Sequence, residues 1–398
     1  MWSGLLLICL WLLPSPAWSQ YEIEQERPFW LRGLLDVRIA RGGRAPSWMD
    51  RGPGKTRYGG RATPEGLNKI TRFTLAQLAL EVGGTLPWEL TSHAQMNLET
   101  AADDEDRPLL IEAYLRKEWG EWGKGWGLQT GVMNIPFSLE HTGPAWTSPY
   151  TLTPSALNTW LWEEIRLVGV EGEWWRVTSG GLRLGLLAGA GFGPDQLGKL
   201  LAVRGWVLSD YLSGVNGDLP LPQRGERLSV FDERDHRPAV YLWFTASDSQ
   251  NRGELRFGYF DNLGDQGTRG VWETRFGTLG AIVHPLARMD LLVQYLVGET
   301  RTRSTPSDSA LSAFYALLSY HYRGHRLSAR YDVFRVGDLD GAHATRERGD
   351  GVTLAYFFEF GLHHRVGVEY TFLYSRRPAR LRSDPSDDGW QLSYRFRY

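Results

Sequence analysis

The sequence predicts an all-β fold, a transmembrane antiparallel β-barrel of about 16 strands, and three observations support this prediction. The last ten residues alternate without a break, with Trp390, Leu392, Tyr394, Phe396 and Tyr398 on one face and polar residues on the other. After residue 19, no apolar run approaches the roughly 18 residues that a transmembrane helix requires. The 18 Trp, 17 Tyr, 16 Phe and 46 Gly suit strands that meet lipid on one face and water on the other.

Residues 1–19 are predicted to be a signal peptide. An apolar run over 5–13 has the length of an h-region, two prolines end it, and Ala17-Trp18-Ser19 matches a cleavage site. The only cysteine of the chain, Cys9, lies inside this segment and lacks the small residues that precede a lipoprotein site. Residues 20–398 are therefore expected to be exported and to form a single barrel without disulfides or a lipid anchor.

Alternating segments separated by glycine, proline and charged residues define the predicted wall. The clearest strand covers 88–98, where the polar face would not be tolerated in a packed core. In the strand over 109–119, Leu109 and Ile111 fall on the apolar, lipid-facing side, and a tight turn is predicted near Glu173. The predicted strands are 29–41, 72–82, 88–98, 109–119, 126–132, 164–172, a longer strand that ends at 191, 239–247, 254–261, 271–283, 289–299, 311–322, 327–336, 352–360, 365–375 and 390–398.

Three stretches without periodicity are predicted to be long outer loops, near 42–69, 135–161 and 192–238. The last of them contains an ambiguous segment, 200–208, that has some strand character. Single-chain bacterial barrels have even strand numbers, short periplasmic turns and long outer loops. Counting 192–238 as one loop, with room for a short helix, gives about 16 strands and places the short turns on one side. Totals of 14 or 18 strands remain open alternatives.

The chain end and the architecture resemble known outer-membrane proteins. A terminal strand that closes on aromatic residues, here Trp390, Tyr394, Phe396 and Tyr398, is similar to the signal that the barrel-assembly machinery recognises. Over essentially the whole mature chain, the leader, the strand number and the long third outer loop resemble Gram-negative porins. The resemblance implies a bacterial outer-membrane location, contacts with lipid and lipopolysaccharide, the assembly machinery as a partner and a homotrimer as one possible assembly. It also implies that the third loop, 135–161, folds into the barrel.

Charged side chains on the inward faces would set the selectivity of such a pore. Both signs occur in similar number, so neither anion nor cation selectivity is predicted. For most of these residues, a solvated lumen position or a cross-strand pair is the simpler interpretation. The pore-lining candidates are Arg32, Asp36, Arg38, Glu89, His93, Glu99, Glu112, Arg116, Glu118, Arg330, Asp332 and Arg395.

The third loop supplies its own candidates. If it folds inward, Glu140 and His141 are placed at the constriction. Just after it, Glu163, Glu164 and Arg166 form a charged cluster that would tether the loop to the wall. A simple surface ion pair is the alternative interpretation of that cluster.

These features favour passive diffusion of small hydrophilic solutes through a water-filled channel. An alternative is an outer-membrane interaction protein, an adhesin or a sheath for a partner, whose lumen would be plugged. The many polar inward positions favour an open channel, although residues 192–238 are a candidate plug.

An outer-membrane hydrolase is the weakest alternative, and the protein is not expected to be an enzyme. Ser92 and His93 point to opposite faces of a strand, while Ser319 and His321 are separated by roughly 6–7 Å of strand rise. The net charge of -2, without a basic patch, argues against nucleic acid as a partner. Neither a cofactor nor a metal site is expected.

Overall fold

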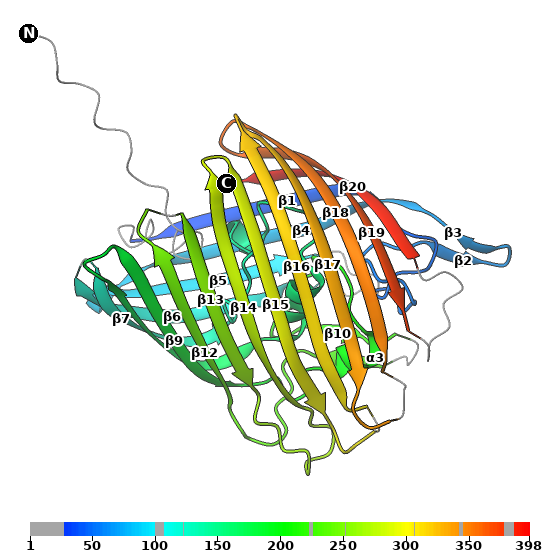
Figure 1. Ribbon diagram of the computed structural model, residues 1–398, viewed down its shortest axis with the longest axis horizontal. Coiled ribbons are helices and arrows are strands. Elements are labelled where there is room, and N and C mark those ends of the chain that lie inside the picture. Colours follow the sequence, from blue (N-terminus) through cyan, green and yellow to red (C-terminus); the bar gives the residue numbers. More distant parts are fainter. Residues whose placement is uncertain are drawn as a thin grey trace, which may run out of the picture.

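The computed structural model describes residues 28–99, 107–121, 123–222, 226–250, 252–305, 307–341, 345–377 and 386–398. Sixteen antiparallel strands form one closed barrel (Figure 1), which confirms the predicted fold class and strand number. The predicted signal peptide, 1–19, lies outside the described residues. Within the described residues, no helix has the length and apolar character needed to cross a membrane.

The strands of the barrel are longer than predicted at many ends. They are β1 (Trp30–Arg41), β4 (Thr71–Leu86), β5 (Leu90–Leu98), β6 (Leu109–Glu121), β7 (Lys124–Met133), β8 (Leu167–Val177), β9 (Leu182–Phe192), β12 (Ala239–Asp248), β13 (Gly253–Asp261), β14 (Glu273–Leu286), β15 (Met289–Arg301), β16 (Ser309–Tyr322), β17 (His325–Asp338), β18 (Glu347–Phe360), β19 (His364–Arg376) and β20 (Ser386–Arg397).

The remaining elements lie in the connections. They are the two-stranded sheets β2 (Arg61–Thr63) with β3 (Gly66–Asn68) and β10 (Asp218–Pro220) with β11 (Arg227–Ser229), the helices α2 (Ala156–Glu164) and α3 (Lys199–Arg204), and the 3-10 turns η1 (Pro87–Glu89) and η2 (Pro144–Trp146). The ambiguous segment 200–208 thus begins within helix α3. Between β9 and β12, the residues that the structure describes contribute no strand to the barrel.

The first and last strands close the wall. β20 pairs with β1 from Leu34 opposite Arg397 to Arg41 opposite Trp390. Beyond this ladder, the backbone N–H of Tyr398 donates to the Gly33 carbonyl at 2.9 Å, and the Gly33 N–H donates back at 3.1 Å. The predicted pairing of the terminal strand with the first strand is confirmed, and it leaves the sheet without a free edge.

The two faces of the wall differ in chemistry as the alternation predicts. In β18, Val352, Leu354 and Tyr356 are exposed on the outside, while Thr353 and Ala355 are buried on the inside. The exterior therefore offers an apolar band of the kind that lipid requires.

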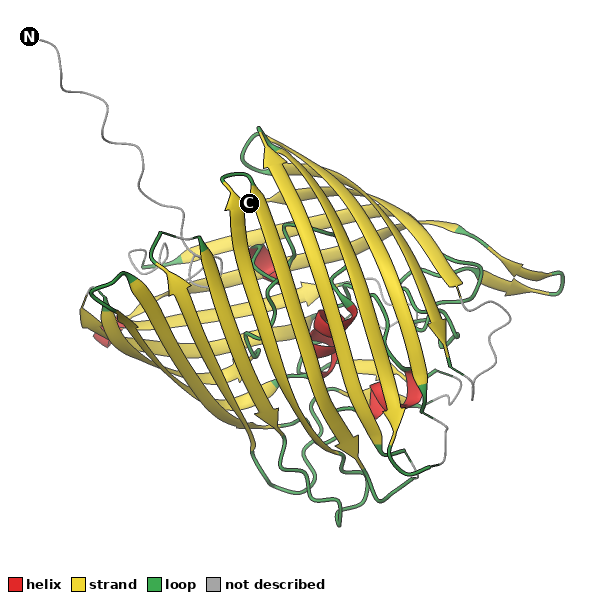
Figure 2. Ribbon diagram, viewed as in Figure 1, coloured by secondary structure: helices red, strands yellow, loops and turns green. Residues whose placement is uncertain are grey.

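The two ends of the barrel also differ. In Figures 1 and 2, the short turns gather at one end of the barrel and the long connections at the other.

Two long connections enter the lumen: the segment 134–166, which contains α2, and the segment 193–238, which contains α3. Figure 2 shows α2 within the barrel, surrounded by strands. Apolar side chains from both segments pack against one another and against inward-facing Phe260, Phe276 and Phe334. The polar inward faces of the strands predicted an open lumen. In the structure, the lumen is partly filled at the long-loop end.

The predicted turn near Glu173 is wrong. β8 continues through this residue to Val177, and the turn follows at 178–181. Glu173 therefore lies on the inner wall.

Two predicted side-chain directions on β6 are also wrong. Leu109 and Ile111 are buried in the core of the lumen because the register shifts between Gln95 and Met96 of β5. An extra residue in one strand turns the neighbouring side chains to the other face. Strict alternation cannot reveal such a bulge.

Candidate functional site

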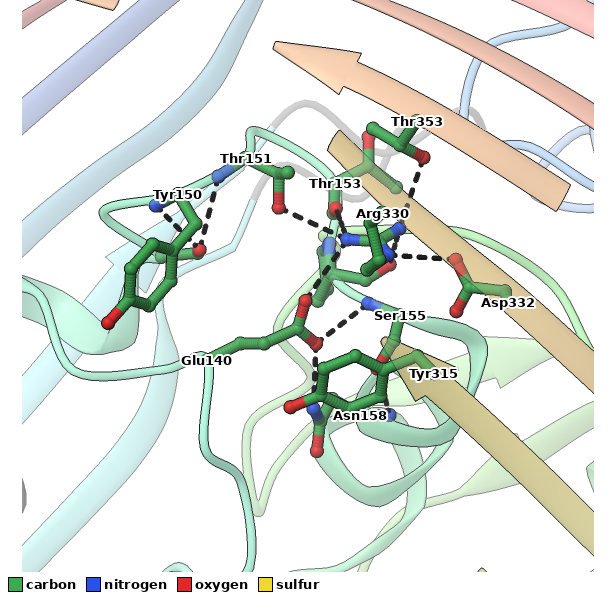
Figure 3. Close-up of polar contacts among 12 residues, drawn as sticks. Glu140, Tyr150, Thr151, Thr153, Ser155, Asn158, Tyr315, Arg330, Asp332 and Thr353 are labelled. Carbon is green, nitrogen blue, oxygen red and sulfur yellow. Dashed lines mark hydrogen bonds and ion pairs between the residues drawn. The ribbon is translucent and has the colours of Figure 1, made fainter. Parts of the chain in front are cut away.

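The third outer loop is fixed inside the barrel by Arg330 of β17, as Figure 3 shows. The guanidinium donates to Glu140 Oε1 at 3.1 Å, to the Thr153 carbonyl at 2.6 Å and to the Pro154 carbonyl at 2.9 Å. It also pairs with Asp332 on its own strand at 2.8 Å. The planar fork of arginine suits this role, because its several donors point in fixed directions. One wall residue therefore holds several points of the loop.

The carboxylates around Arg330 continue the contact into helix α2. The second oxygen of Glu140 accepts hydrogen bonds from the Ser155 N–H at 2.9 Å and from the Asn158 amide at 2.7 Å (Figure 3). Asp332 accepts from the N–H of Ala156 at 3.1 Å. These groups satisfy donors at the start of the helix that would otherwise have no intrahelical partner.

The second inserted segment is held at the barrel seam by Asp210. Its carboxylate lies 2.7 Å from Arg38 of β1 and 3.2 Å from Arg57, which belongs to the first long connection. Arg38 also pairs with Asp36 at 2.9 Å, and Asp36 with Arg395 of β20 at 2.6 Å. A continuous network of buried ion pairs therefore joins both closing strands to the segment inside the lumen.

No family model matches the sequence, and no curated protein matches it. Solved structures of outer-membrane proteins do match the architecture of this chain. An anion-selective porin from Comamonas acidovorans aligns with a TM-score of 0.58 at 13% identity, covering 94% of this chain and 100% of that chain. The outer membrane channel DcaP of Acinetobacter baumannii gives 0.57 at 11%, with 93% and 97% covered. The trimer form of OmpT, an outer membrane protein of Vibrio cholerae, gives 0.53 at 10%, with 93% and 99% covered.

This chain has the porin fold. The closed barrel of sixteen strands and the coverage of nearly the whole chain support that assignment.

Inside this porin-fold barrel, the third loop lies in the lumen, and both of its constriction candidates are buried. Glu140 bonds to Arg330 and α2, as described above. The Nδ1 atom of His141 lies 2.7 Å from the Ser138 hydroxyl, and its ring packs against Trp162 with the centroids 4.7 Å apart. Burial, and then the charge of Arg166, lower the pKa of His141 to about 3. The imidazole is therefore neutral at pH 7.

The charged cluster that follows the loop does not anchor it to the wall. Glu163 pairs with Arg204 of α3 at 2.7 Å, and Glu164 accepts from the N–H groups of Gly198 and Leu200 at 3.0 and 2.9 Å. These contacts join the two inserted segments to each other. The prediction that the cluster tethers the loop to the wall is wrong, because its partners lie in the second inserted segment. That segment has no periodic pattern from which their position could be predicted.

Arg166 also differs from the prediction. Its guanidinium donates to the carbonyls of Ile165 and Trp162 at 2.6 and 2.9 Å and lies over the Trp162 ring, 5.3 Å from its centroid. Arg166 thus supports the end of α2 from within the same segment.

Most of the pore-lining candidates on the strands do face inward. His93 lies 3.6 Å from Glu112, and Arg116 forms ion pairs with Glu118 and Glu173. Three others lie elsewhere in the lumen: Arg32 stacks over Trp30, Glu99 pairs with Arg57 at 3.2 Å, and Arg395 belongs to the seam network.

Glu89 is the exception among the pore-lining candidates. Its backbone has a φ of 58° within η1, and its side chain is 88% exposed next to Lys117. The strand begins only at Leu90, because η1 turns the chain at Pro87. Glu89 therefore lies at the rim and not on the inner wall.

Several residues of the lumen were not predicted. Arg57, Arg204 and Asp210 lie in connections, where no periodic pattern indicates a direction. Glu171 and Glu173 face inward on β8, and both are buried. The alternation of Glu171 and Glu173 with Val170 and Trp174 would have revealed this pair if the strand had been extended past Gly172.

Proposed function

We propose that this chain is an outer-membrane channel that lets small hydrophilic solutes diffuse passively, with the two inserted segments limiting their size. The observation that carries the proposal is the charged inner wall near the short-turn end. Charges are costly to bury in a dry interior, so a wall of this kind is suited to water. The residues concerned come from strands around much of the barrel and are Arg116, Arg256, Asp290, Arg326 and Arg365.

The proposed location is the bacterial outer membrane. The apolar exterior and the aromatic C-terminal strand support it, as does the predicted signal peptide. A homotrimer is part of the proposal, supported by the trimer form of the similar OmpT. Lipid, lipopolysaccharide and the barrel-assembly machinery are the partners that such a location entails.

The packing at the long-loop end favours a second candidate function. Trp160 of α2 and Trp206, just after α3, are both fully buried, with ring centroids 5.7 Å apart. Such a core would suit a plugged barrel that presents its outer loops to a partner. The two candidates differ in whether the unmodified protein conducts ions.

Planar-bilayer recording of the purified protein tests both candidates. The ends of the second segment lie together, since the Asp195 N–H donates to the Asp232 carbonyl at 3.2 Å. Residues 196–231 can therefore be replaced by a short Gly-Ser linker. The proposed channel predicts small conductance steps for the wild type and steps several times larger for the deletion variant.

The outcomes separate the candidates. A silent wild type with a conducting deletion variant would support the plugged barrel, and silence from both folded proteins would contradict a channel. Replacing 62–67, the tip of the β2–β3 hairpin, with a shorter linker is the matched control. This hairpin projects away from the barrel (Figure 1), so its shortening should leave the conductance unchanged.

A further inference from the structure

A polar cavity lies between the inner wall and the start of the third loop. Strands β6, β7, β8, β9 and β12 form one side, and the chain near Asn134 and Trp146 forms the other. The cavity has a volume of about 70 Å³. It is separate from the Arg330 cluster and from the seam network, since it shares no lining residue with either.

Four polar atoms of residues that line this cavity have no hydrogen-bond partner within the described part of the chain. They are Gln129 Oε1, Asn134 Oδ1, Asn134 Nδ2 and Glu173 Oε1. The residues are only 5%, 6% and 4% exposed. Buried polar groups in proteins are nearly always bonded, because an unpaired one costs about 1–3 kcal/mol. Their gathering around one cavity therefore indicates a site that a polar molecule occupies.

The chemistry of these atoms selects the occupant. Three of the four are acceptors and one is a donor, so the occupant must bring mostly donors. Glu112, Glu171 and Glu173 line the cavity together with a single cation, Arg116, which already pairs with Glu118 and Glu173. Acidic side chains thus outnumber basic ones on the lining.

Two indole rings complete the site. Trp146 donates its Nε1–H to Glu112 at 2.9 Å, which fixes this ring at the cavity. Trp243 lines it from β12. Aromatic faces attract organic cations, and their apolar surface suits a short alkyl group.

We propose that this cavity binds the ammonium end of a small organic amine. An ammonium group has three donors and no acceptor, which matches the acceptors left free by Gln129, Asn134 and Glu173. The inference deepens the proposed channel function by naming a solute class, and it rests on that function only for the transport of the solute. Binding itself is independent of conduction.

Saturation-transfer difference NMR on the full-length protein in deuterated detergent tests the site without requiring an open channel. Methylammonium is the probe, and tetramethylammonium, which has the charge but no N–H donor, is the comparison. Methanol and acetate serve as the neutral and anionic comparisons. We expect saturable transfer to methylammonium at least fivefold stronger than to any of the three.

Two substitutions each remove one of the three free acceptors while the side-chain hydrogen bonds described above stay in place. Gln129→Leu and Asn134→Leu are each expected to weaken methylammonium binding at least fivefold while the barrel stays folded. Glu171→Gln, which keeps an acceptor for the Tyr241 hydroxyl (2.6 Å from Glu171) but removes a charge, should weaken it as well. Gln391→Leu on β20 is the control. It removes hydrogen bonds to Arg38 and Thr153 but no residue that lines the cavity, so it should bind methylammonium as the wild type does.

Each outcome decides the inference. Equal transfer to methylammonium and methanol, or no saturable transfer at all, would mean that the cavity holds water only and would overturn the proposal. Unchanged binding in both Leu variants would do the same. Binding by a protein that is silent in bilayers would support the site and contradict the channel. Conduction without binding would support the channel and contradict the site.

Discussion

The guanidinium of Arg38, on the first strand of the barrel, lies 2.7 Å from the carboxylate of Asp210, inside the second inserted segment. Arg38 also contacts Asp36, which in turn pairs with Arg395 of the last strand. The seam that closes the barrel is therefore the same place that holds the inserted segment. This coupling makes Asp210 the residue whose loss should release the segment while the wall stays intact.

Asp210→Asn is expected to loosen the segment 193–238. The substitution removes the charge that Arg38 and Arg57 share, and breaking a buried ion pair costs about 3–5 kcal/mol. Since Asp36 and Glu99 still neutralise the two arginines, a loss near the lower limit is expected. Hydrogen exchange of peptides from 193–238 should rise at least tenfold, with little change in the barrel strands.

The matched control for this variant is Asp218→Asn. Asp218 pairs with Arg107 at 2.9 Å, but the two side chains are 30% and 42% exposed, respectively. Exposed pairs contribute about 0–1 kcal/mol, so exchange should change little. Equal exchange in the two variants would contradict a special role for Asp210.

Strong acid should release the same segment. Burial raises the pKa of Asp210, but the charges of Arg38 and Arg57 outweigh it and hold this pKa below its ordinary value of 3.8. For an acid whose pKa is lowered by folding, the stabilisation is present above the unfolded value and is lost as the pH falls through the folded value. Channel conductance should thus be steady from neutral pH down to about pH 4 and change below it. The Asp210→Asn variant should show no such step.

Arg330→Met is expected to free the third loop. It leaves the Glu140 and Asp332 carboxylates buried without their cation, which costs about 3–5 kcal/mol. Both a lower melting temperature and a larger conductance should result. The melting temperature and the conductance of Arg330→Lys should lie between those of Arg330→Met and of the wild type, because lysine offers a point charge without the planar fork.

Arg335→Met provides the control for the Arg330 variants. Arg335 lies on the same strand, but its side chain is exposed. The wild-type melting temperature and conductance should be retained. A similar loss in both Met variants would show that the strand, and not the anchoring of the loop, is affected.

Removal of Tyr398 is expected to impair closure of the barrel. The residue exchanges two backbone hydrogen bonds with Gly33, and each contributes about 0.5–1.5 kcal/mol. The fraction of heat-modifiable, folded protein on unboiled gels should fall. Tyr398→Phe keeps the backbone bonds and the ring, so normal folding is expected, and a defect in that variant would point to the hydroxyl instead.

Alternation in the sequence was sufficient to predict the wall. The period of two places Val352, Leu354 and Tyr356 outside and Thr353 inside, and the closing pair of strands follows from the even count. The prediction failed where the backbone departs from a regular strand. The bulge that turns Ile111 inward and the positive φ angles at Trp88 and Glu89 are local deviations that the pattern does not record.

The sequence by itself determined the class of fold, an even strand number near 16 and which end of the barrel carries the long loops. The tertiary structure alone decided what fills the lumen. Alternation reports that one face of each strand is polar, but both water and a folded-in loop satisfy a polar face. Only the closing of the wall brings Asp210 to Arg38 and the third loop to Arg330, since the partners lie far apart in the chain and no local pattern links them.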